Sequence, residues 1–202
     1  VRVHSQCQTG DDCMSGYCIL TPGGRKCTKT CIEECPFDWE CVQHGPSRPD
    51  DVYICAPTMV SLCTPCMTND ECMTNGVDLG ESCVSYGPAG NFCGGSCTAD
   101  QQCPDGYVCA QRQDVAGAAV QQCVLEEGQC PCSQMAVDEM ATTECYEENQ
   151  WGKCTGERKC VAAGLQPCSA MVPAKEQCNG EDDDCDGEVD EDIEAVECTV
   201  IN

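Results

Sequence analysis

Cysteine makes up 26 of the 202 residues, and this density decides what the chain can fold into. A share this high is typical of small domains held together by disulfides. The usual core formers are scarce, because Leu, Ile, Val and Phe together supply 29 residues. With a net charge of −25, such a chain is expected to be disordered unless it is cross-linked. Disulfides, each worth about 2–4 kcal/mol, replace the missing core.

The sequence therefore predicts a small disulfide-rich fold, in which tandem Cys-rich modules contain short strands, turns and little helix around no large hydrophobic core. Disulfides persist in oxidising compartments, so we expect a secreted protein, extracellular or on a cell surface. The cysteines are spread along the chain, which argues against a cytosolic thiolate store for metal. No apolar run approaches 18 residues, so no membrane span is expected. The acidic surface makes nucleic acid an unfavourable partner.

Cysteine spacing reveals two similar segments. The eight cysteines from Cys7 to Cys55 are separated by 5, 4, 8, 3, 3, 5 and 13 residues. The eight from Cys66 to Cys123 are separated by 5, 10, 9, 3, 5, 5 and 13, so four of the seven gaps are identical. The stretches CPFDWEC and CPDGYVC also correspond. This pattern predicts a tandem repeat.

The repeat divides the chain into three expected modules, namely residues 1–62, 63–129 and 130–202. Additional cysteines at the two joints, Cys63 and Cys130, are candidates for bonds that hold one module to the next. In the third module, CSQMAVDEMATTECYEEN has apolar residues at the spacing of one helical face, so a short helix is expected there. The following WGKCTGERKCVAAG is expected to form a hairpin. Alternating apolar residues at both ends of the chain predict terminal strands.

An acidic run in the third module matches a calcium-binding loop. Ten of the fourteen residues from 181 to 194 are Asp or Glu, and their repulsion requires a neutralising partner. The alternation fits the pattern Asp-x-Asp-x-Asp-Gly-x-apolar-Asp, in which alternate side chains direct oxygen ligands to one Ca²⁺. Gly187 then provides the turn and Val189 an inward apolar anchor. The ligands assigned by this alignment are Asp182, Asp184, Asp186, the carbonyl of Glu188, and Asp190.

The alignment departs from an EF-hand at its last position. Ile193 stands where a bidentate Glu is required, so we expect Glu191, a neighbouring carboxylate or Asn179 to complete the shell. No flanking helices are expected either. Cys178 and Cys185 are expected to hold the loop covalently instead. The alternative is an acidic segment that is merely solvated.

The same residues carry a resemblance to a known family. The stretch from Cys178 to Glu191, CNGEDDDCDGEVDE, resembles the MopE-type metal-binding motif of secreted and surface Cys-rich bacterial proteins, with a weaker similarity over residues 151–192. The motif covers about a tenth of the chain. The resemblance implies an extracellular bacterial protein that binds metal, and it implies no particular activity.

These observations favour a structural role over an enzymatic one. No pairing of a nucleophile with a base is recognisable, so we expect no catalysis. The leading hypothesis is a secreted, calcium-binding structural protein that forms an extracellular filament from head-to-tail copies of itself. One alternative is a monomeric binding or adhesion module that recognises a surface protein or a glycan. Another is a copper scavenger, which the carboxylate loop and the presence of only two histidines disfavour.

Overall fold

The computed structural model describes residues 5–21, 24–32, 34–35, 39–44, 52–73 and 79–193. The expected terminal strands therefore lie outside the described residues, apart from Ser5 and Gln6. Among the described residues, no helix is both long enough and apolar enough to cross a membrane.

Disulfides dominate the architecture, as the composition predicts. Twelve are described, and none of the described cysteines is free. Their persistence requires an oxidising environment. In each eight-cysteine segment the first cysteine bonds the third, the second the fourth, the fifth the seventh and the sixth the eighth. These bonds are Cys7–Cys18, Cys13–Cys27, Cys31–Cys41 and Cys35–Cys55, then Cys66–Cys83, Cys72–Cys93, Cys97–Cys109 and Cys103–Cys123.

The first segment contains two small antiparallel ribbons. Strand β1 (Cys18–Ile19) pairs with β2 (Lys26–Cys27), and β3 (Trp39–His44) pairs with β4 (Val52–Pro57). A 3₁₀ turn, η1 (Gly10–Asp12), precedes them, and Asp12 accepts backbone N–H bonds from Gln8 and Thr9. The ribbons share a small apolar core of Ile19, Val42, Ile54 and Ala56.

The middle segment repeats this arrangement. Strand β5 (Cys83–Ser85) pairs with β6 (Asn91–Cys93), and β9 (Ala119–Leu125) lies between β7 (Gly95–Ser96) and β8 (Tyr107–Gln113). The 3₁₀ turns are η2 (Asn69–Cys72), η3 (Gly87–Ala89) and η4 (Asp100–Gln102). Its interior consists mainly of cystine and Phe92. The described structure is thus a small disulfide-rich fold, which confirms the predicted fold class.

The third segment is built on a long hairpin. Strand β10 (Thr142–Glu148) pairs along its whole length with β11 (Lys153–Val161), which also pairs with β12 (Gly164–Leu165). The predicted short helix is present as α1 (Gln134–Asp138), but it covers only the first part of the expected stretch, because β10 takes the rest. Ser133 caps its start by accepting the Ala136 N–H. Met140, whose spacing places it on the predicted helical face, has a φ of 51° and is 71% exposed; it lies between the end of α1 and the start of β10.

Packed contacts join the segments to one another. Leu79 of the middle segment lies against the apolar core of the first. Cys63 and Cys130 form a bond that closes the middle segment from its beginning to its end, while Cys132 bonds Cys160 within the third. The hairpin docks on the middle segment where Thr143 Oγ1 accepts the Asn91 N–H at 2.7 Å.

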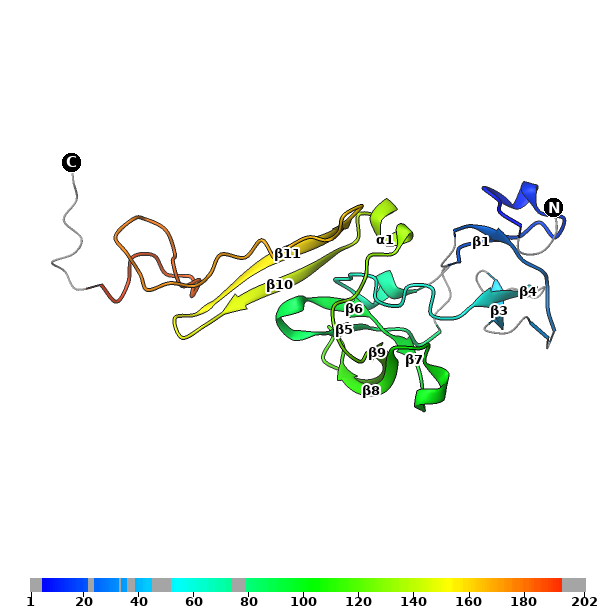
Figure 1. Cartoon of the computed structure of the whole chain (residues 1–202), viewed down its shortest axis with the longest axis horizontal. Coiled ribbons are helices and arrows are strands. Elements are labelled where there is room, and N and C mark those ends of the chain that lie inside the picture. Colours follow the sequence, from blue (N-terminus) through cyan, green and yellow to red (C-terminus); the bar gives the residue numbers. More distant parts are fainter. Residues whose placement is uncertain are drawn as a thin grey trace.

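The whole molecule is elongated (Figure 1). The β1–β2 ribbon lies at one end, the middle segment lies at the centre, and the β10–β11 hairpin leads to the opposite end. The acidic run lies beyond the turn of this hairpin, at the far end of the long axis.

Candidate metal centre

The acidic loop, defined here as residues 176–193, is anchored to the turn of the β10–β11 hairpin. A disulfide between Cys154 of β11 and Cys185 fixes the middle of the loop. Gly152 approaches the Asp184 carbonyl so closely that any Cβ would collide with it. Asn149 donates its side-chain N–H to the Pro173 carbonyl at 2.6 Å. Cys178 is disulfide-bonded as well, so covalent bonds act where an EF-hand has helices.

The loop backbone is shaped by its own side chains. Asp182 accepts the Cys185 N–H at 2.6 Å, and the Asp184 and Asp186 side chains each accept the N–H two residues ahead. Such short-range bonds are the reason why Asp favours turns. Gly187 has a φ of 99°, which lets the chain reverse at this point. The sequence thus encodes a tight irregular loop.

Glu176 lies at the centre of this loop and is only 6% exposed. Its Oε1 accepts the N–H of Asp183 at 2.6 Å and of Asp184 at 3.1 Å. Its Oε2 accepts the N–H of Asp190 at 2.9 Å. One buried carboxylate therefore organises two distant parts of the loop.

Three carboxylates converge at this centre. One oxygen atom from each of Glu176, Asp184 and Glu191 lies within 4.8 Å of the other two. Glu191 Oε2 is buried and has no hydrogen-bond partner in the part of the chain that the structure describes. A buried, unsatisfied carboxylate oxygen facing like charges is unfavourable unless a cation balances it or a proton neutralises it. The geometry thus has the oxygen donors of a cation site and an excess of negative charge that a cation would neutralise.

The pKa values of two of these groups reflect the crowding. Burial raises the pKa of Asp184, and the charges on Asp186, Glu176 and Asp182 raise it further, against a hydrogen bond from the Asp186 N–H. Burial likewise raises the pKa of Glu191, with Glu176, Asp186 and Asp184 contributing in the same direction. A cation at this position would oppose both shifts.

The structure separates the ligands assigned by the loop pattern into two groups. Asp184 and Glu191 converge on the centre, with Asp186 close enough to affect the pKa of both. The hydrogen bonds of the other three side chains are made to neighbouring groups of the loop. Asp182 accepts the N–H of Cys185 and of Gly187, Asp190 accepts those of Asn179 and Gly180, and Asn179 contacts Glu181 N–H and the Asp183 carboxylate.

One further detail differs from the sequence pattern. Val189 is 55% exposed, so its assignment as an inward apolar anchor is wrong. Glu188 is assigned through its carbonyl, and its side chain is exposed. Glu176 was not among the assigned ligands, because it precedes the acidic run and the calcium-loop pattern does not include it. One signal was available, since Glu176 lies in PAKEQC, within the stretch of weaker resemblance to the MopE-type motif.

The donor set determines which metals suit the site. Carboxylate oxygens are hard ligands and favour Ca²⁺, Mg²⁺ or Mn²⁺. The described clusters of neighbouring cysteines offer no competing thiolate site, because their sulfur atoms are already in disulfides.

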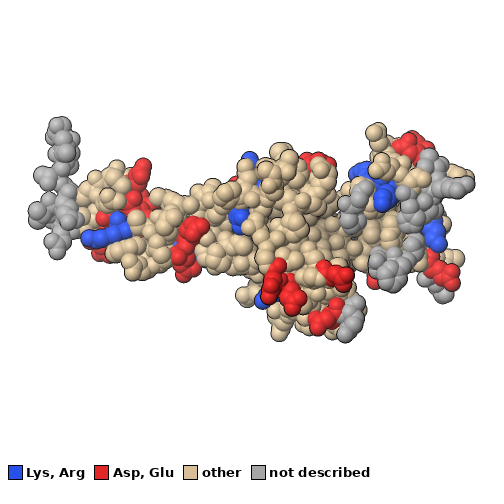
Figure 2. All heavy atoms as spheres, in the orientation of Figure 1, with Lys and Arg blue, Asp and Glu red and all other residues tan. Residues whose placement is uncertain are grey.

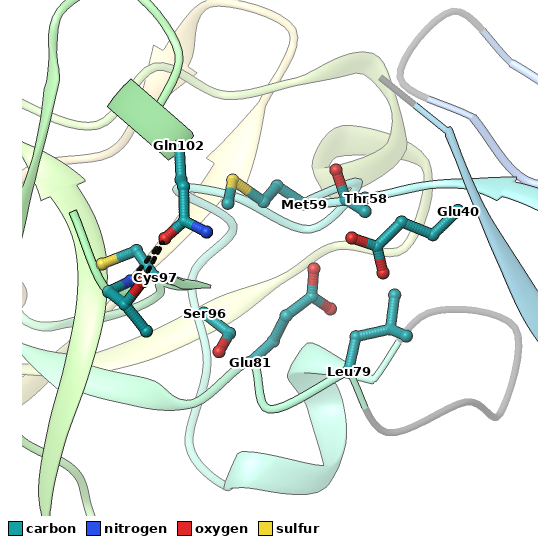
Figure 3. Close-up of a pocket in the computed structure, with 9 residues that line it drawn as sticks. Glu40, Thr58, Met59, Leu79, Glu81, Ser96, Cys97 and Gln102 are labelled. Atoms are coloured by element: carbon teal, nitrogen blue, oxygen red, sulfur yellow. Dashed lines mark hydrogen bonds between the residues drawn. The ribbon is translucent and has the colours of Figure 1, made fainter. Parts of the chain in front are cut away.

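A second acidic feature is a cavity of 330 Å³ between the first and middle segments (Figure 3). The carboxylates of Glu40 and Glu81 point toward each other across it, and Met59 and Leu79 form part of its wall. On another side Gln102 accepts hydrogen bonds from Thr98. None of its nine lining residues is Lys, Arg or His, so the cavity favours cations.

Comparisons with protein families, with curated proteins and with solved structures find no match to this chain. The geometry described above therefore carries the functional argument.

The raised pKa values predict how cation binding depends on pH. Protons compete for Asp184 and Glu191 at a higher pH than for ordinary carboxylates, which titrate near 4. Calcium affinity is therefore expected to be lower in mildly acidic buffer than at neutral pH, and isothermal titration calorimetry at the two pH values measures the difference. In the calcium-free protein, thermal stability is expected to change with pH in the opposite direction. A carboxyl whose pKa is raised by folding destabilises the folded state while ionised, so thermal stability in chelator is expected to increase as the pH falls through the raised pKa. Equal calcium affinity at both pH values would contradict this assignment.

Proposed function

We propose that this chain is a calcium-binding structural protein of an extracellular environment, in which Glu176, Asp184 and Glu191 hold one Ca²⁺ at the far end of an elongated, disulfide-stapled rod. The observation that carries the proposal is the convergence of the Glu176, Asp184 and Glu191 carboxylates, together with a buried Glu191 Oε2 that has no hydrogen-bond partner among the described residues. Asp186, whose charge raises the pKa of both Asp184 and Glu191, is a further source of oxygen. Calcium requires six to eight oxygen ligands, and water supplies the remainder in an open site.

Calcium fits the site better than its competitors. Mg²⁺ demands near-ideal octahedral geometry, whereas Ca²⁺ accepts the variable directions that an irregular loop offers. Copper prefers His, Met or thiolate ligands. The described histidine, His44, is on β3 in the first segment, and the acidic loop contains neither Met nor a free thiol.

The elongated shape supports a structural role. Local cystine cores give each segment its own stability, and the same disulfide connectivity in the first two segments is what a tandem duplication would produce. Calcium would rigidify the end that is richest in acidic residues. Such a rod is suited to serve as the subunit of an extracellular filament.

Electron microscopy of the purified protein in millimolar calcium, and again after chelation, tests this proposal. Regular fibres that disappear on chelation are the expected result, with about one calcium per chain by elemental analysis. Fibres that survive chelation would show that assembly does not require calcium. Dispersed particles in both conditions would contradict the filament and favour the monomeric binding or adhesion module. Stoichiometric copper without calcium would overturn the assignment of the metal.

A further inference from the structure

The two ends of the rod differ in charge. Residues 1–62 contain eight acidic and five basic residues, a net charge of −3. Residues 130–202 contain eighteen acidic and four basic residues, a net charge of −14. Arg25, Lys26 and Lys29 lie on or beside β2, and Figure 2 shows Lys and Arg side chains at that end of the molecule. Because the acidic loop lies at the opposite end of the long axis, the molecule is electrostatically polar along its length.

The two ends also expose apolar side chains. Ile32 is 93% exposed and Met14 is 87% exposed, and both lie in the first segment near the basic residues. Residues 13–15 contact β2 through the Cys13–Cys27 bond and through the Ser15 hydroxyl, which donates to the Thr28 carbonyl. Met14 therefore lies on a segment that is held beside the one containing Lys26 and Lys29.

The far end has corresponding apolar groups. Val172 is 69% exposed and Val189 is 55% exposed, within or directly before the acidic loop. In the described part of the middle segment, no large apolar side chain is more than 39% exposed, and the most exposed of them is Val115. Met140, at 71%, is the one strongly exposed apolar residue away from both ends among those described. Exposed apolar groups next to charge are typical of contact sites.

We propose that these two surfaces bind each other between copies of this chain. The N-terminal end, defined by Met14, Arg25, Lys26, Lys29 and Ile32, docks on the distal end, defined by Val172, Glu181, Glu188, Val189 and Asp192, of a second copy. The contact joins different surfaces of the two copies, so it does not close and continues into a linear polymer. This inference rests on the proposed structural function, for which it names the partner and both contact surfaces. Arg25, Lys26 and Lys29 of one copy then face carboxylates of the next, whereas head-to-head pairing would oppose basic side chains to one another and tail-to-tail pairing would oppose acidic ones.

Two variants test the contact by removing one surface each. Lys29→Glu/Ile32→Asp alters only the N-terminal end, and Val172→Lys/Glu181→Lys alters only the distal end, outside the three converging carboxylates. All four side chains are exposed. Sedimentation velocity in millimolar calcium is expected to show the native protein forming oligomers. Each variant alone is expected to remain monomeric, with self-association weakened on the order of tenfold or more.

Mixing the two variants gives the decisive result. Each retains one intact surface, so the mixture is expected to form dimers of one copy of each variant and nothing larger. Met67→Lys, in the middle segment, is the matched control and is expected to assemble like the native protein. Mass spectrometry with and without reduction verifies that every variant keeps its disulfides.

The outcomes distinguish this inference from the proposed function. If both variants assemble like the native protein, the proposed contact surfaces are wrong, while the filament itself is unaffected. Variants that fail to form mixed dimers would contradict head-to-tail docking. A native protein that binds calcium by calorimetry but stays monomeric at all concentrations would overturn self-association while leaving the calcium site intact.

Discussion

Glu176→Gln is expected to weaken calcium binding by about 10–100-fold, the effect typical of losing a group that ligates or orients a metal site. The substitution removes one of three converging negative charges while it keeps an amide oxygen of nearly the same shape. That oxygen can still accept the N–H of Asp183 or Asp184, so part of the loop structure is retained. Isothermal titration with calcium measures the affinity. Backbone NMR shifts in chelator report whether the empty loop keeps its conformation.

Two matched variants separate this prediction from the loop pattern. Glu188→Gln removes the same charge from an exposed side chain of the same loop and is expected to change the affinity little. Asp182→Asn affects the first ligand of the sequence pattern, whose carboxylate oxygens accept the N–H of Cys185 and Gly187 in the structure. We expect it to loosen the loop with a smaller loss of affinity than Glu176→Gln. The opposite order, with Asp182→Asn as the more damaging change, would favour the sequence pattern over the convergent site.

The fold class was predictable because cysteine count and the scarcity of apolar residues constrain it directly. A chain with so few Leu, Ile, Val and Phe can be ordered only through many local cross-links. The pairing itself was not predictable, since eight cysteines alone allow about a hundred connectivities. Spacing shows where equivalent cysteines lie along the chain, and only the three-dimensional arrangement shows which of them meet.

The third segment shows where periodicity fails. Met135, Val137 and Met140 have helical spacing, yet only residues 134–138 are helical. The following residues pair with β11 instead, where Cys145 is fully buried and bonded to Cys168. Tertiary pairing and a disulfide outweigh a weak local preference over so short a stretch.

The sequence pattern and the structure place the candidate site on the same stretch of the chain, but they assign its residues different roles. Alternating carboxylates were all treated as ligands, although several of them cap backbone N–H groups. Whether an Asp turns its oxygen atoms toward a cation or toward its own backbone depends on the loop conformation, which the disulfide from Cys154 to Cys185 constrains from outside the pattern. Glu176 was missed because its proximity to Glu191 arises from folding over fifteen residues.

Replacing Cys63 and Cys130 together with Ala is expected to lower the free energy of unfolding of the middle segment by about 4 kcal/mol. This bond spans 67 residues and encloses the whole segment, so its loss frees the largest loop among the described disulfides. Both sulfur atoms are buried against Phe92, in a cluster that Leu125 and Leu165 also contact. Ala bears a Cβ like Cys, so the positive φ of 65° at residue 63 is no more strained than before. Hydrogen exchange of β5–β9 and thermal unfolding measure the effect.

The bond between Cys7 and Cys18 provides the matched comparison, because it encloses a separation of only 11 residues at one end of the rod. The same double replacement there is expected to cost about 3 kcal/mol and to leave exchange in β5–β9 unchanged. The Cys63–Cys130 variant should also loosen the hairpin, since Leu165 of β12 packs on the cluster that this bond completes. The distal end would then lose its fixed direction relative to the first segment, so filaments should become shorter or irregular while calcium affinity is retained. Equal losses of stability from the two double replacements would show that loop length is not the source of the stabilisation. Unchanged hydrogen-exchange protection of β5–β9 in the Cys63–Cys130 variant would show that the rod is rigid without this bond.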